Sequence, residues 1–306
     1  MTGPSRFGMR LAAAMDRHGP LCVGIDPHPG LLVDWGLADD VEGLRTFCLT
    51  VLDAVVGHVA AIKPQSAFFE RHGSAGIAVL EEVLRAARGQ DGGTQVILDA
   101  KRGDIGSTMQ GYADAYLREG APLACDALTV SPFLGFGSLT PAVEAAERSG
   151  SGLFVLALTS NPEGAQVQHA VPPGPSGHGS VAGTIVSAAG ALNARELDGA
   201  VGAQGPAGAD GGIGGLGSIG LVVGATVGAA VRDLGLDLAA VRGPLLAPGV
   251  GAQGAGPEEL GQVFGSARRA VLASSSRGVL ASGPQVSALR AAARAAADDA
   301  ARALGR

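Results

Sequence analysis

Short, nearly continuous apolar runs recur along the chain and alternate with amphipathic stretches. Runs of this kind are typical of parallel strands that are buried on both faces. The apolar runs predict eight strands, at residues 21–26, 58–63, 94–101, 125–131, 152–160, 219–226, 243–250 and 269–276. Helical periodicity predicts helices between and after them, among them 41–56, 74–88, 107–120 and 284–304. The last of these would begin with a proline, which first turns tolerate.

Eight strand–helix units in succession predict a (β/α)8 TIM barrel, with residues 1–306 forming a single domain. A doubly wound sheet is the alternative, but it has no natural place for eight such units. We expect two loop inserts, at about 161–180 and 199–218. The first would lie on the catalytic face of a barrel, and the second on the opposite face. The second is rich in glycine and is expected to be a flexible surface loop. It precedes a strand, whereas a dinucleotide-binding glycine turn follows one.

Composition and charge exclude several classes of protein. Hydrophobic residues make up 46% of the 306 residues, which is too many for a disordered chain. The formal net charge is −6 and no basic run is present, which argues against nucleic-acid binding. The longest apolar run, 219–231, is short and broken by glycines, so no membrane span is expected. The N-terminus lacks the apolar core of a secretory signal.

Cysteine and histidine spacing gives no sign of a metal site. The three cysteines form no CxxC pair, and the six histidines form no HxH or HExxH motif. This usage indicates a reduced, cytoplasmic protein with inert thiols.

Lysine usage is unusual. Of the 22 basic residues only Lys63 and Lys101 are lysines, and both end predicted strands. Arginine cannot usefully give up its proton, whereas the pKa of a lysine can be tuned. We therefore expect these two lysines to carry chemistry, although chance survival is the alternative.

Charged side chains gather at the ends of the first three predicted strands. Asp99 and Lys101 are two residues apart, so both side chains would face the mouth of a barrel. Lys63 would stand beside Asp99, and Asp26 ends the first strand. Asp104 follows a glycine and need not face the same way. The alternatives are a structural ion pair at a strand end and, for Asp26, a turn residue before proline.

Two glycine- and serine-rich turns follow the seventh and eighth predicted strands. In barrels these positions often bind phosphate. The turns span 248–254 and 274–278, where Gln253 could donate an amide hydrogen bond and Arg277 could clamp an anion. Arg277 could instead be a solvated loop residue. Ser160, which ends the fifth strand, could contact the polar edge of a planar ring.

The segment DAKRGDIGST (99–108), with IKPQSAFFE upstream and PGVGAQG and SSSRG downstream, resembles orotidine 5'-phosphate decarboxylase. The longer bacterial branch, often found in actinobacteria, fits best. Related sugar-phosphate decarboxylases share the DxKxxD element, but they use magnesium and place an acid at the end of strand two. This chain has Lys63 there. The resemblance therefore implies metal- and cofactor-independent decarboxylation of orotidine 5'-phosphate to uridine 5'-phosphate, in pyrimidine biosynthesis, by a cytoplasmic homodimer with shared active sites.

The resemblance also implies roles for individual residues. Lys63, Asp99, Lys101 and Asp104 would form a charged tetrad, with Asp104 contributed by the other subunit. Lys101 would stabilise and protonate the C6 carbanion. The substrate-binding residues that the resemblance implies are Asp26 and Lys63 for the ribose, Thr108 across the interface, Ser160 for the pyrimidine, and Gln253 and Arg277 for the phosphate.

Two departures from the family pattern lie near the end of the fourth strand. Ser131-Pro132-Phe133 stands where the branch often has Asn-Pro-Tyr, and Gly137 stands where it often has Asp. They concern local loop contacts and not the reaction. Two other functions stay open on the residues alone. One is a phosphosugar lyase or aldolase in which Lys101 forms a Schiff base. The other is a barrel that binds nucleotides without catalysis.

Overall fold

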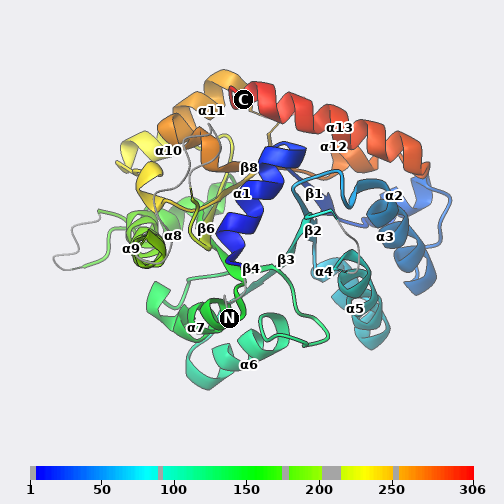
Figure 1. The fold of residues 1–306 in the computed structure, drawn as a ribbon, viewed down its shortest axis with the longest axis horizontal. Coiled ribbons are helices and arrows are strands. Elements are labelled where there is room, and N and C mark those ends of the chain that lie inside the picture. The colour runs from blue at the N-terminus through cyan, green and yellow to red at the C-terminus, as the bar shows by residue number, and fades with distance from the viewer. Residues whose placement is uncertain (1–4, 89–91, 174–178, 202–214, 251–254) are drawn as a thin grey trace.

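The computed structural model describes residues 5–88, 92–173, 179–201, 215–250 and 255–306. Within these ranges, eight parallel strands close into a barrel in the order in which they occur along the chain. The fold is therefore the (β/α)8 TIM barrel that the apolar pattern predicts (Figure 1). The strands are β1 (Leu21–Ile25), β2 (Ala61–Pro64), β3 (Gln95–Arg102), β4 (Ala127–Val130), β5 (Gly152–Leu158), β6 (Ile219–Val223), β7 (Leu245–Pro248) and β8 (Val271–Ser275).

Helices surround the barrel. The α-helices are α1 (Phe7–His18), α2 (Pro29–Asp34), α3 (Val41–Val55), α4 (Ala67–Glu70), α5 (Gly73–Arg88), α6 (Gly106–Tyr116), α7 (Thr140–Ser149), α8 (Ala165–Gln168), α9 (Val181–Val201), α10 (Gly228–Asp233), α11 (Pro257–Phe264), α12 (Arg277–Leu280) and α13 (Val286–Ala303). The 3-10 helices are η1 (Phe136–Leu139), η2 (Pro162–Gly164), η3 (Ala239–Val241) and η4 (Gly265–Ala270).

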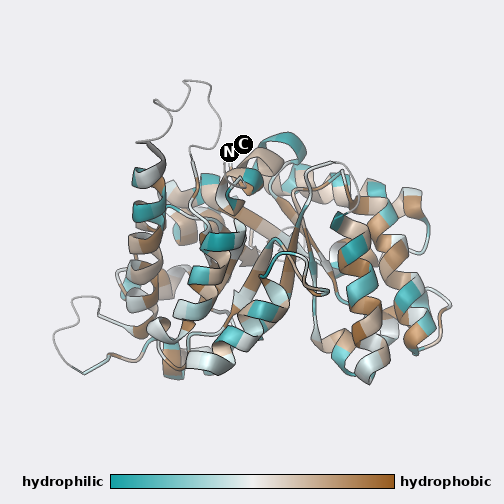
Figure 2. Cartoon of the chain, turned by 60° about the horizontal axis from the view of Figure 1, so that its bottom comes forward, coloured by the Kyte–Doolittle hydropathy of each residue, from teal (hydrophilic) through white to brown (hydrophobic). Residues whose placement is uncertain are grey.

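The core lies mainly between the barrel and its helices. Each strand is almost entirely buried, as its continuous apolar run requires. The helices bury one stripe each; on α3 it includes Leu44, Phe47 and Val51. Figure 2 shows this division, with largely hydrophobic strands inside helices that alternate between hydrophobic and hydrophilic positions. No helix of the described residues is long and apolar enough to cross a lipid bilayer.

The helix α1, which the sequence analysis did not single out, closes one end of the barrel. Its residues Phe7, Leu11 and Met15 pack with the strand residues that point into the barrel, and Figure 1 shows the helix lying across it. The rings of Phe7 and Phe154 meet edge to face, with centroids 5.9 Å apart. Gly152 is required here, because a Cβ atom would lie 2.1 Å from the Phe7 ring. This packing fills the end where the strands begin and leaves the other end for chemistry.

The structure corrects the expected boundaries of three elements. Residues 199–201 belong to α9, and 202–214 lie outside the described residues. At the other end of that insert, Leu216 is buried and Ser218 hydrogen-bonds the Glu196 carboxylate, so these residues are part of the packed fold. In the 161–180 insert, residues 162–168 form η2 and α8, and 174–178 lie outside the described residues. The last helix begins at Val286 rather than at the proline.

Candidate active site

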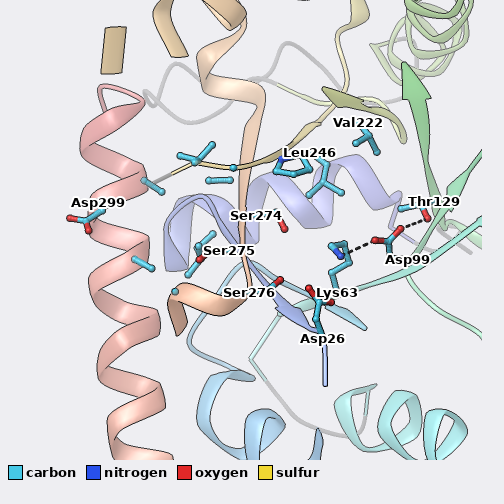
Figure 3. Close-up of a pocket in the computed structure, with 18 of the residues that line it drawn as sticks. Asp26, Lys63, Asp99, Thr129, Val222, Leu246, Ser274, Ser275, Ser276 and Asp299 are labelled. Carbon is cyan, nitrogen blue, oxygen red and sulfur yellow. Dashed lines mark hydrogen bonds and ion pairs between the residues drawn. The ribbon is translucent and has the colours of Figure 1, made fainter. Parts of the chain in front are cut away.

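Charged side chains meet at the carboxyl ends of β1, β2 and β3. Asp26, Lys63, Asp99 and Lys101 line one cavity of about 750 Å³, together with apolar side chains that include Leu156 and residues of β6 and β7. Figure 3 shows Asp26, Lys63 and Asp99 close together in this cavity. The cavity also extends to α13, whose Asp299 lies on the opposite side of β8 from Lys63. The charged cluster therefore occupies only part of the volume.

Asp99 is the hub of the cluster. Its Oδ2 atom accepts hydrogen bonds from Lys63 Nζ at 2.9 Å and from Gln65 Nε2 at 3.0 Å. Its Oδ1 atom accepts from Lys101 Nζ at 2.6 Å and from Thr129 Oγ1 at 2.8 Å. The carboxylate is only 6% exposed. Four donors thus fix both oxygens of one buried carboxylate, and two of these donors are ammonium groups.

The electrostatics favour the charged forms of Asp99 and Lys63. Burial raises the pKa of Asp99, but the nearby charges of Lys63 and Lys101 more than offset this, and the pKa falls to about 2. Burial lowers the pKa of Lys63, but the carboxylates of Asp99 and Asp26 outweigh burial, and its pKa is raised. At neutral pH the site therefore holds a carboxylate between two cations.

Asp26 has an unused acceptor. Its Oδ1 atom is buried and has no hydrogen-bond partner among the described residues. A buried carboxylate oxygen without a donor is costly, so a ligand hydroxyl at this position would be favoured. The residue lies directly after β1, which ends at Ile25, one residue before the predicted end of the strand.

The sequence analysis missed two residues of this cluster, Gln65 and Thr129. Gln65 follows Lys63 by two residues, so the alternation used for Asp99 and Lys101 could have found it. Thr129 is a lone polar residue in the apolar strand β4 and is 1% exposed. Its position in an otherwise apolar strand was the available signal.

Asp104 and Thr108 lie outside the cavity that Asp99 lines. Asp104 uses its Oδ1 atom to accept a hydrogen bond from the Ile105 amide at 2.8 Å. Thr108 is exposed near the start of α6. The structure therefore does not bring Asp104 against Lys101 within one chain.

The residues expected at the phosphate are only partly described. Pro248 at the end of β7, Gly249 and Val250 directly after it, and Ser274–Ser276 at the end of β8 line the cavity. Arg277 begins α12 and is exposed, and Gln253 lies outside the described residues. Ser160 is exposed beyond β5, and its neighbour Thr159 bonds Asn161 and Gln168.

The two departures from the family pattern have different surroundings. A Cβ atom on Gly103 would lie 2.2 Å from the carbonyl oxygen of Ser131, so the β3 and β4 ends pack tightly there. A Cβ atom on Gly137 would meet nothing within 4 Å, so the space there would admit a larger residue. In the described part of the chain, no three His, Cys, Asp or Glu side chains are grouped so that they could hold a metal ion.

This arrangement suits a reaction in which negative charge develops close to Lys101. The Lys101 side chain is 44% exposed and reaches the cavity, while its Nζ atom stays on Asp99. An ammonium held in place by hydrogen bonds needs little reorganisation when it stabilises an anion. It can also donate a proton.

Comparison with known proteins places the chain in a family. The family model of the orotidine 5'-phosphate decarboxylase / HUMPS family matches residues 19–292. The chain is 56% identical over 289 residues to orotidine 5'-phosphate decarboxylase of Streptomyces coelicolor, covering 94% of each chain. It is 55% identical over 287 residues to the enzyme of that name from Salinispora arenicola, again covering 94% of each.

The solved structures give the same result. A crystal structure from Streptomyces avermitilis, provisionally named orotidine 5'-phosphate decarboxylase, aligns with a TM-score of 0.86 at 54% identity and covers 100% of this chain and 98% of the other. OMP decarboxylase of Leishmania donovani aligns with a TM-score of 0.71 at 26% identity and covers 98% of this chain and 100% of the other. The chain therefore belongs to the orotidine 5'-phosphate decarboxylase / HUMPS family.

Proposed function

We propose that this protein decarboxylates orotidine 5'-phosphate to uridine 5'-phosphate, as its named relatives do, without a metal or cofactor. One observation carries the proposal: the Asp99 carboxylate lies between the ammonium groups of Lys63 and Lys101, at 2.9 and 2.6 Å, at the mouth of the barrel. The sugar-phosphate decarboxylases that the sequence resembles would have an acid where Lys63 stands. The site therefore favours the nucleotide substrate.

The reaction needs stabilisation of a carbanion. The bond between C6 and the carboxylate breaks, CO₂ leaves, and the electron pair stays on C6. The Lys101 ammonium would stabilise this pair by its charge and then donate a proton from Nζ to C6. Lys101 would recover its proton from solvent. Asp99 would hold the ammonium in position, since its Oδ1 atom accepts the hydrogen bond from Nζ.

The remaining substrate contacts are proposed from the family resemblance and, for Asp26, from a carboxylate oxygen that has no hydrogen-bond partner among the described residues. Asp26 would accept a ribose hydroxyl, which the free and buried Oδ1 atom supports. The resemblance implies that Arg277 and Gln253 would bind the phosphate. The position of Arg277 at the start of α12, directly after the cavity-lining Ser274–Ser276, supports its role. Ser160 would contact the pyrimidine.

We also propose a homodimer in which Asp104 and Thr108 complete the partner's site. Asp104 lies outside its own cavity, which supports a role elsewhere. Beside it, Ile105 is 62% exposed, and Phe133 and Leu134 at the end of the neighbouring strand β4 are 74% and 53% exposed. Exposed apolar side chains at the ends of β3 and β4 support an interface there.

The whole chain, residues 1–306, would act as one barrel domain in the cytoplasm. The three cysteines are buried and free, which supports work in a reducing compartment.

The test is ultraviolet monitoring of orotidine 5'-phosphate consumption by the purified protein, with a metal chelator present. The proposal expects full turnover and uridine 5'-phosphate as the product. Loss of activity in the chelator would contradict the metal-free reaction. Binding without turnover would favour a nucleotide-binding barrel. Borohydride trapping of a carbonyl substrate on Lys101 would favour the Schiff-base reaction.

A further inference from the structure

The backbone of Lys101 is in an unusual conformation. Its φ angle is +47°, and among the described residues only one other non-glycine residue, Arg242, has a positive φ. In the same stretch, the pairing of β3 with β4 shifts register between Leu98 and Arg102. A lysine side chain disfavours this left-handed region, so the surrounding contacts must hold it there.

Thr129 on β4 makes that contact. The Lys101 amide donates to Thr129 Oγ1 at 2.9 Å, and the same hydroxyl donates to Asp99 Oδ1 at 2.8 Å. The direction of both bonds is fixed by chemistry, because an amide N–H can only donate and a carboxylate can only accept. A hydroxyl has one proton and can accept as well, so it satisfies both neighbours.

These bonds form a closed ring with the lysine side chain. The ring runs from the Lys101 amide through Thr129 to Asp99 Oδ1, and from Asp99 Oδ1 back to Lys101 Nζ at 2.6 Å. Lys101 is therefore held at its backbone by Thr129 and at its ammonium by Asp99, and these two side chains are bonded to each other. Figure 3 shows the bond between Thr129 and Asp99 at the edge of the cavity.

We propose that Thr129 is a positioning residue for Lys101: its hydroxyl fixes the left-handed backbone of the lysine and thereby the direction of the ammonium toward the substrate. The inference rests on the proposed role of Lys101 in the decarboxylation. A reacting group that is misplaced by about 1 Å can lose on the order of 100-fold in rate. Thr129 itself lines the cavity, but its hydroxyl is engaged by the Lys101 amide and by Asp99 Oδ1, so it can act on the rate through the position of Lys101.

Valine is the informative replacement at position 129, because it has the shape and β-branching of threonine without the hydroxyl. Thr129→Val should lower kcat and kcat/KM together by on the order of 10- to 100-fold, with KM and uridine 5'-phosphate affinity changed by less than about threefold. Thr129→Ser keeps the hydroxyl and should retain most of kcat.

Thr94 provides a matched control at the other end of β3. Its hydroxyl also makes two bonds, accepting from the Gly57 amide at 2.9 Å and donating to the Val59 carbonyl at 2.7 Å. Thr94→Val should lower stability and leave kcat per folded molecule unchanged. An equal fall in kcat in Thr94→Val would show that loss of any such hydroxyl slows the enzyme, and would overturn the proposal.

A second measurement is independent of turnover. The chain has only two lysines, so ¹⁵N-lysine labelling gives backbone amide signals from Lys63 and Lys101 alone. In Thr129→Val the Lys101 amide should shift and exchange with solvent faster, while Lys63 stays unchanged; Thr129→Ser should preserve both signals. An unchanged Lys101 amide in Thr129→Val, or a kcat within about twofold of the active wild type, contradicts the proposal. A wild type without turnover would instead contradict the proposed function, and the amide signals would still test the geometry.

Discussion

The Nζ atom of Lys101 lies 2.6 Å from the Oδ1 atom of Asp99, and this contact joins a half-exposed ammonium to a buried carboxylate. Asp99 also accepts hydrogen bonds from Lys63, Gln65 and Thr129, so it cannot move without breaking three other hydrogen bonds. The ammonium of Lys101 is therefore positioned by a carboxylate that is itself held in place.

The Asp99 carboxylate should make stability depend on pH. Its pKa in the folded protein is lowered to about 2, whereas an unfolded aspartate titrates near 3.9, so its contribution is present above pH ~4 and is lost as the pH falls toward 2. Asp99→Asn should lower the free energy of unfolding at pH 7 by about 3 kcal/mol, because it leaves Lys63 charged and buried. Denaturant titrations of both proteins between pH 7 and pH 2 would measure the difference.

The difference in free energy of unfolding between wild type and Asp99→Asn should shrink by about 2 kcal/mol as the pH falls from 7 to 2, since Asp99 becomes protonated and thus neutral like asparagine. Glu82→Gln is the control, because its ion pair with Arg45 has the same 2.6 Å distance but is partly exposed. It should cost less than about 1 kcal/mol. A constant difference between wild type and Asp99→Asn at all pH values would contradict the assignment.

Arg277→Ala should weaken phosphate binding. We expect KM for orotidine 5'-phosphate to rise on the order of 10- to 100-fold, because a guanidinium makes strong, often bidentate, bonds to phosphate. Affinity for the nucleoside uridine should stay unchanged, which calorimetric titration can measure. Arg232→Ala on α10, whose guanidinium donates to Gln262 at 3.5 Å, is the control. An unchanged preference for nucleotide over nucleoside in Arg277→Ala would place the phosphate elsewhere.

Asp104 should act in the partner's site. Neither Lys101→Ala nor Asp104→Ala should be active alone. In a mixed dimer one site carries both lesions and the other carries neither, so random pairing should restore about a quarter of wild-type sites. Differently tagged chains would confirm the exchange before turnover is measured. Confirmed exchange with no recovery would mean that Asp104 serves its own chain.

Shortening residues 202–214 to a brief Gly-Ser link should preserve kcat. The described chain resumes before β6, which begins at Ile219 at the end of the barrel opposite the cavity, and loop-length costs are small. Removing 215–218 as well should lower the melting temperature, because Leu216 is buried and Ser218 bonds Glu196. A loss of kcat in the first deletion at unchanged melting temperature would contradict this placement of the insert.

Much of the fold could be predicted because its strands are buried on both faces. Such strands leave continuous apolar runs, and each predicted run overlaps an observed strand. The proximity of Lys63 and Asp99 also followed, because they end neighbouring parallel strands. These features depend on local pattern and on the regular order of a barrel, which a sequence carries directly.

Other features depend on contacts between distant residues. The packing of α1 against the end of the barrel depends on contacts of Phe7 with Phe154 and Gly152. These residues are far apart in the sequence, so a local pattern does not predict the contacts. The left-handed backbone of Lys101 arises where the β3–β4 pairing shifts, and Thr129 gains its role only from that shift.

Turnover of Lys101→Ala tests the central claim most directly. Its matched control is Arg102→Ala, the next residue, whose guanidinium pairs with Glu70 and which does not line the cavity. The account predicts that Lys101→Ala lowers kcat for orotidine 5'-phosphate by at least about 1,000-fold while the folded protein still binds uridine 5'-phosphate, and that Arg102→Ala stays near wild type. A Lys101→Ala protein that turns over within about tenfold of wild type would contradict the role of this lysine as the carbanion's partner and proton donor.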